Sequence, residues 1–182
     1  MTVGATNKGG IRSMRSISLR SYCVRAAITI STILLLLGVP AMAAGAFAGF
    51  KGRWSGSGTI KPADSAAERI RCNANYRPRG SSEAEIDLSL SCDSDTYKFS
   101  LNGQFQSDAG NRVTGNFTET TRGVGGQVFG SASGGRMQIH VESSAFSANM
   151  VLNTRGSSQS VSIDAQGGGQ TVKASITLHR GG

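Results

Sequence analysis

Two cysteines, Cys72 and Cys92, are the residues whose type and spacing point to a definite reaction. The third cysteine, Cys23, lies in a basic and apolar N-terminal segment that we expect to be removed. An even number of cysteines in an exported domain predicts a disulfide, because thiols are oxidised outside the cytoplasm. If the intervening chain folds as a hairpin about Ser82, Cys72 faces Cys92 across two strands. We therefore predict a Cys72–Cys92 disulfide.

The remaining reactive side chains form no recognisable catalytic or metal-binding motif. The sequence contains no G-x-S-x-G, H-E-x-x-H, P-loop or G-x-G-x-x-G pattern. His140 and His179 are isolated and alternate with apolar residues, which places both on the polar face of a strand. Asp93 and Asp95 supply two carboxylates around a turn, whereas calcium sites use about six to eight oxygen ligands. We therefore expect a non-catalytic protein without a cofactor or a bound metal.

Short alternating segments separated by glycine-bearing turns fill the chain after Phe50. Apolar and polar residues alternate with a period of two, which predicts antiparallel strands with one buried face. Gly and Asn in the turns supply the positive φ angles that tight hairpins need. The ten predicted strands cover roughly 53–60, 67–77, 84–92, 95–105, 111–121, 124–132, 136–142, 145–154, 159–166 and 171–180.

The expected fold is all-β, an antiparallel up-and-down β-barrel of about eight to ten strands that follows an N-terminal signal peptide. Short connections favour pairing between sequence neighbours. Closure into a barrel removes the two edges that an open meander would expose. A two-sheet β-sandwich satisfies the same alternation and is the alternative. A transmembrane barrel would also alternate, but the chain has few aromatic residues and no evident aromatic girdles.

The apolar face of this barrel is the part of the domain that can carry a function. Small residues such as Gly56, Gly58 and Ala148 interrupt that face. Small lining residues leave room for a ligand cavity, whereas a fully packed core is the alternative. The side chains that we expect to line the cavity are Tyr76, Leu88, Phe99, Phe117, Met137 and Met150.

Residues 1–43 have the pattern of a signal peptide. Five basic residues and no acidic residue come first, followed by the apolar run 26–39 and an A-x-A site that ends at Ala43. The run of about 14 residues is short for a membrane span, which needs about 20. We expect cleavage after Ala43, which leaves residues 44–182 as a single barrel domain, periplasmic or secreted, with no stable membrane insertion.

Cleavage also changes the charge of the protein. The whole chain carries +8, from 19 basic and 11 acidic residues. The 14 basic and 11 acidic residues that remain after Ala43 leave a net charge of +3. The high charge therefore belongs largely to the targeting segment, and we expect no nucleic-acid partner. The long basic region leaves Met14 as an alternative start to Met1.

The two ends of the barrel domain resemble the calycin signature of lipocalins and fatty-acid-binding proteins. The first strand opens with G-R-W at 52–54 and the last ends with L-H-R at 178–180. The resemblance implies that Arg180 packs across Trp54 and closes one end of the barrel. An even number of strands makes the first and last strands antiparallel neighbours, which also brings Trp54 near an inward-pointing, desolvated Arg180. The T-D-Y motif of lipocalins is missing near mid-chain.

The chain also resembles small periplasmic metalloprotease inhibitors and small exported proteins of alphaproteobacteria. The inhibitors combine a signal peptide, a barrel, a G-x-W-like start and one disulfide. Three functions fit these features: an exported barrel that binds a small apolar ligand, a protease inhibitor, and an envelope structural protein without a ligand. The inhibitor would insert residues 44–51 as an arm into a protease cleft. An enzyme is the least favoured class.

Overall fold

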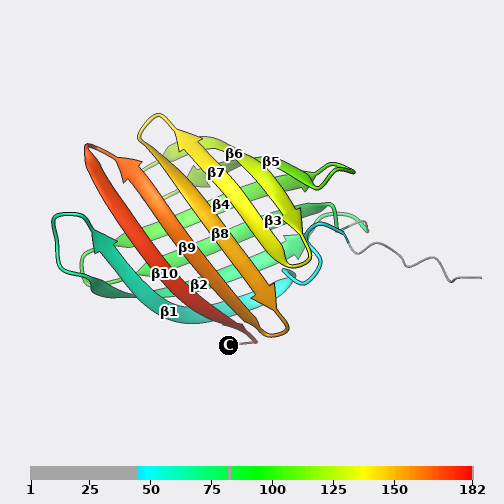
Figure 1. The fold of residues 1–182 in the computed structure, drawn as a ribbon, viewed down its shortest axis with the longest axis horizontal. Coiled ribbons are helices and arrows are strands. Elements are labelled where there is room, and N and C mark those ends of the chain that lie inside the picture. Colours follow the sequence, from blue (N-terminus) through cyan, green and yellow to red (C-terminus); the bar gives the residue numbers. More distant parts are fainter. Residues whose placement is uncertain (1–44, 82, 182) are drawn as a thin grey trace, which may run out of the picture. The chain divides into compact units, whose positions relative to one another are not determined.

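The computed structural model describes residues 45–81 and 83–181. The signal peptide predicted for residues 1–43, its cleavage site and the start codon lie outside the described residues. All ten predicted segments form strands, with bounds that differ by a few residues (Figure 1). The strands are β1 (Gly52–Pro62), β2 (Glu68–Pro78), β3 (Glu85–Asp93), β4 (Lys98–Ser107), β5 (Arg112–Glu119), β6 (Val124–Ser133), β7 (Arg136–Ser143), β8 (Phe146–Arg155), β9 (Ser158–Gly167) and β10 (Gln170–Arg180).

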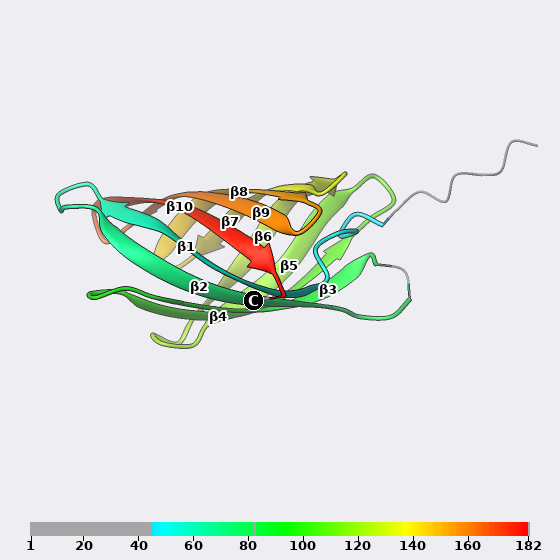
Figure 2. The same cartoon turned by 90° about the horizontal axis from the view of Figure 1, so that it is seen from below.

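The strands close into a single antiparallel barrel. Each strand pairs with its sequence neighbours, and β10 returns to pair with β1. In Figure 1 the red β10 lies beside β1, and their register runs from Trp54 opposite Arg180 to Pro62 opposite Val172. Figure 2 shows the same barrel from a second side, with β1 to β4 along one wall and β7 to β9 along the other. The predicted up-and-down barrel is confirmed, and the β-sandwich alternative is wrong because the sheet closes on itself.

Two glycines on β1 allow this closure. A Cβ atom at Gly56 would lie 2.0 Å from the carbonyl oxygen of Thr177, and a Cβ atom at Gly58 would lie 2.0 Å from that of Ser175. The backbone of β10 therefore approaches β1 more closely than any side chain on the inner face permits. Glycine at such positions lets a strand bend sharply, as strands of closed barrels must.

The turn between β6 and β7 shows why glycine punctuates the hairpins. Its two residues, Gly134 and Gly135, have φ angles of 58° and 79°. Two-residue hairpin turns of this mirror-image type match the twist of the flanking strands and need positive φ at both positions. The G-G dipeptide thus fixes the register in which Ser133 faces Arg136.

The apolar face of the sheet points into the barrel and the polar face meets solvent, as the alternation predicts. Along β7, for example, Met137, Ile139 and Val141 are buried while Gln138 and His140 are exposed. Transmembrane barrels have the reverse arrangement, with the apolar face outward. No helix within residues 45–81 and 83–181 has the length and apolar character that a membrane crossing requires.

One end of the barrel is closed by the short turn that precedes β1. Within it Phe47 and Phe50 are buried, Phe50 completely. The backbone N–H of Phe47 donates to the carbonyl of Glu83 at 3.4 Å. The expectation that residues 44–51 form a free arm for a protease cleft is therefore wrong for residues 45–50, because two aromatic side chains draw this segment onto the barrel.

Candidate ligand-binding site in the barrel lumen

A cavity of about 410 Å³ occupies the lumen of the barrel. This volume lies within the roughly 300–1,000 Å³ range of pockets that hold small-molecule ligands. Strands from all sides of the barrel contribute to its wall, and the wall is almost entirely apolar. All six side chains that the sequence predicts for the lining contribute to it: Tyr76, Leu88, Phe99, Phe117, Met137 and Met150.

The turn before β1, Trp54 and Tyr76 fill the barrel end beneath the cavity, which we call the floor, and of these residues Tyr76 lines the cavity itself. The indole Nε1 of buried Trp54 donates a hydrogen bond of 2.7 Å to the carbonyl oxygen of Phe50. The Phe50 ring lies edge-on against Tyr76, with ring centroids 5.8 Å apart, and against Phe47 at 6.5 Å. This aromatic cluster seals the barrel end from solvent, because every one of its rings is buried.

A buried polar chain crosses the lumen beside this floor. The Tyr76 hydroxyl donates to Gln159 Oε1 at 3.1 Å, and Gln159 Nε2 donates to Thr154 Oγ1 at 2.9 Å. Burial raises the pKa of the Tyr76 hydroxyl, so that it stays protonated and remains a donor. Sequence reasoning missed Gln159. Gln159 lies two residues before the apolar Val161, and this spacing assigns it to the inward face of β9.

Trp54 and Arg180 meet at the closed end, as the resemblance implies. They are directly opposed in the β1–β10 ladder, and the Arg180 guanidinium carbon lies 4.6 Å from the centre of the Trp54 ring. The guanidinium also donates to the carbonyl oxygen of Gly49. Arg180 is exposed, however. The expectation of a desolvated arginine is wrong, because Phe47 and Phe50 of the turn before β1 occupy the buried space at this barrel end and Arg180 remains exposed.

Cys72 and Cys92 form a disulfide in the cavity wall. Their sulfur atoms are 2.08 Å apart, and the two residues are directly opposed between β2 and β3. The same register pairs Tyr76 with Leu88 and Ala74 with Leu90, as the hairpin argument predicts. The bond therefore joins two neighbouring strands through groups that face the lumen.

The mouth of the cavity lies at the end opposite the floor. The lining residues that are exposed to solvent, Lys98, Arg122, Ala145 and Gln166, all lie in or beside the turns at this end. The carboxylate of Glu119 also lines the cavity here, although its residue is only 1% exposed. Sequence reasoning missed Glu119, which occupies an inward position two residues after Phe117.

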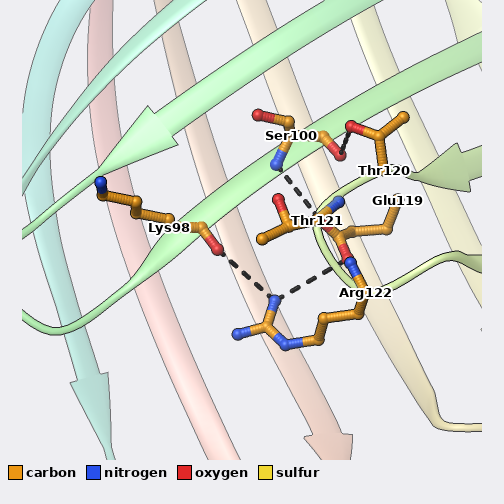
Figure 3. A network of polar contacts seen from close by, with 6 residues as sticks. All are labelled: Lys98, Ser100, Glu119, Thr120, Thr121 and Arg122. Carbon is orange, nitrogen blue, oxygen red and sulfur yellow. Dashed lines mark hydrogen bonds and ion pairs between the residues drawn. The ribbon is translucent and has the colours of Figure 1, made fainter.

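Backbone N–H groups hold the Glu119 carboxylate (Figure 3). Ser100 and Thr121 donate to Oε1 at 3.2 and 2.9 Å, and Arg122 donates to Oε2 at 2.8 Å. Burial by itself raises the pKa of the Glu119 carboxyl, but these hydrogen bonds outweigh it and hold the pKa below its usual value. Glu119 thus stays ionised and orders the turn between β5 and β6.

The polar residues that were considered for catalysis or metal binding lie away from the lumen. His140 is exposed, and its Nδ1 lies 3.0 Å from Asn149 Oδ1. His179, Asp93 and Asp95 are exposed as well. A second hollow, of about 340 Å³, lies over β1 to β4 and the start of the β5–β6 turn, and is lined largely by Ser, Asn and Thr side chains. It offers no apolar enclosure comparable with the lumen.

The sequence matches no protein-family model and no curated protein. Several solved structures share the fold, among them the following two. An S-type phycobiliprotein lyase, CPES from Guillardia theta, has a TM-score of 0.57 and 12% sequence identity over 75% of this chain and 90% of its own. Rv2717c from M. tuberculosis has a TM-score of 0.61 and 13% identity over 74% of this chain and 94% of its own. At such low identity the likeness establishes the calycin-like barrel fold and no activity.

Proposed function

We propose that this protein is a non-catalytic barrel that binds a small apolar ligand in its lumen. The observation that carries the proposal is the enclosed apolar cavity of about 410 Å³, closed at one end by the Phe47–Phe50 turn and open at the other. Apolar surface of this kind gains free energy when a ligand displaces water from it.

One structural neighbour is consistent with the ligand-binding part of this proposal. It is a phycobiliprotein lyase by name, which makes a small-molecule ligand for a barrel of this shape a reasonable proposal. The inhibitor hypothesis gains no support, because Phe47 and Phe50 of the segment that would enter a protease are buried against the barrel.

We also propose that the protein is exported and works in the periplasm or outside the cell. The support is the signal-peptide pattern of residues 1–43 and the Cys72–Cys92 disulfide, since structural disulfides persist in oxidising compartments. Intact mass of the exported protein tests this: cleavage after Ala43 is the expected result, and retention of the segment before it contradicts the proposal.

Nile red, a neutral apolar dye, provides the test of lumen binding. We expect saturable binding to the natural protein and its loss in Ala148→Phe, because Ala148 is a buried lining residue of β8 and a phenyl ring there would fill the cavity. Asn149→Phe is the matched control, because it adds the same ring at the adjacent exposed position. Equal binding by all three proteins, or no binding by the natural protein, would contradict the proposal and favour a structural protein without a ligand.

A further inference from the structure

The polarity of the cavity wall is concentrated at its mouth. Between the floor and the mouth the lining is apolar, and the side chains that can be charged near neutral pH are confined to Lys98, Glu119 and Arg122 within the described lining. An occupant that fills the lumen is therefore enclosed by apolar groups along its length. Only the end of it that reaches the mouth meets charged side chains.

The Glu119 carboxylate is already hydrogen-bonded within the protein and does not require a ligand as a partner. Three backbone N–H groups occupy its two oxygens at 2.8 to 3.2 Å. A carboxylate held by several backbone donors is stabilised without a counter-ion, since these charge-assisted hydrogen bonds are the strong kind. Loss of the neighbouring guanidinium would therefore not leave this buried charge unsatisfied.

Arg122, by contrast, is only loosely held. Its Nη1 lies 3.8 Å from Glu119 Oε2 and 3.5 Å from the carbonyl oxygen of Lys98, both at the long limit for such contacts. Its side chain is 58% exposed. A guanidinium carries five N–H donors, and within the described residues these two acceptors are the ones it meets. Figure 3 shows the ammonium of Lys98 pointing away from it.

Resting on the proposed function, we propose that the ligand is an amphiphile with an acidic head group, which Arg122 binds at the mouth while the apolar tail fills the lumen. A guanidinium fork matches a carboxylate or phosphate in a bidentate manner. Arg122 can turn to such a head group at little cost, because its contacts to Glu119 and Lys98 are long. Glu119 then acts as a positioning residue that holds the turn carrying Arg122.

Competition with bound Nile red tests this proposal. Dodecanoic acid and dodecanol have the same tail and differ in the charge of the head group. In the natural protein, dodecanoic acid should displace the dye about tenfold more effectively than dodecanol, which corresponds to about 1.4 kcal/mol. In Arg122→Gln the two should become equal within about twofold, with dodecanol unchanged.

Arg112→Gln is the matched control for this variant. Arg112 is also an exposed arginine beside a tight turn, and it pairs with Asp108 at 3.2 Å, but it lies at the closed end of the barrel. It should keep the tenfold preference. Equal displacement by the two lipids in the natural protein, or an unchanged preference in Arg122→Gln, would overturn the acidic-head inference while leaving lumen binding intact. Failure of both lipids to displace the dye would overturn the lumen site itself.

Discussion

Substitution of Phe50 by alanine should destabilise the barrel strongly, although this residue precedes every strand. Phe50 is 0% exposed, and its ring contacts those of Phe47 and Tyr76. Truncating a fully buried phenylalanine costs about 3–5 kcal/mol, through lost transfer free energy and the cavity that remains. Each aromatic pair adds about 0.5–1.5 kcal/mol beyond its buried area. The backbone carbonyl that accepts from Trp54 survives the change, so we expect a loss of about 4 kcal/mol.

Urea unfolding, followed by the fluorescence of the single tryptophan, provides the measurement. The urea concentration at the midpoint should fall. The slope of the free energy of unfolding against urea concentration should change little if the folded barrel persists. Phe129→Ala is the matched control, because Phe129 is 42% exposed on the outer face of β6 and its loss should cost less than about 1 kcal/mol. If Phe50→Ala cost no more than Phe129→Ala, the turn before β1 would not be part of the fold, and the closed floor would be refuted.

Three further predictions follow from the wall and the ends of the barrel. Reduction of the Cys72–Cys92 bond, which spans 20 residues, should lower the free energy of unfolding by about 3 kcal/mol, and unfolding curves with and without reductant measure it. Glu119→Gln should be less stable than the natural protein by about 1–3 kcal/mol near neutral pH. Because the folded pKa of Glu119 lies below its unfolded value, this difference should vanish as pH falls through the folded pKa, and a constant difference would contradict the account. Arg180→Ala should cost only about 0.5–1 kcal/mol, the value for an exposed cation–π contact, and additivity with Trp54→Ala would argue against that contact.

The strands, their register and the lumen were predictable because they depend on a period-two pattern that each segment repeats. Inward positions of β2 and β3 alternate cleanly, and the hairpin between them was fixed by equal spacing of Cys72 and Cys92. Gly56 and Gly58 were identified as small inward residues, but their role in the close approach of β10 depends on strand coiling, which no local pattern reveals.

The floor and the mouth were not predictable in the same way. Phe47 and Phe50 lie outside any strand, so no alternation assigns them a face and the sequence pattern does not predict their burial. Their burial also explains why Arg180 is displaced to the surface. Glu119 and Arg122 come together only once the β5–β6 turn is formed. Three backbone N–H donors of that turn and of β4 then keep the Glu119 carboxylate ionised.

The central claim is that an apolar ligand enters the lumen, and the buried tryptophan at the floor tests it most directly. Trp54 is the only tryptophan of the chain. Dodecanoic acid brominated at its terminal carbon should quench the Trp54 fluorescence saturably in the natural protein, because the tail ends beside the lining residue Tyr76, which contacts Phe50 next to Trp54. The quenching should disappear in Ala148→Phe and persist in Asn149→Phe. Quenching that never saturates and is equal in all three proteins, or no quenching at all, would contradict the account.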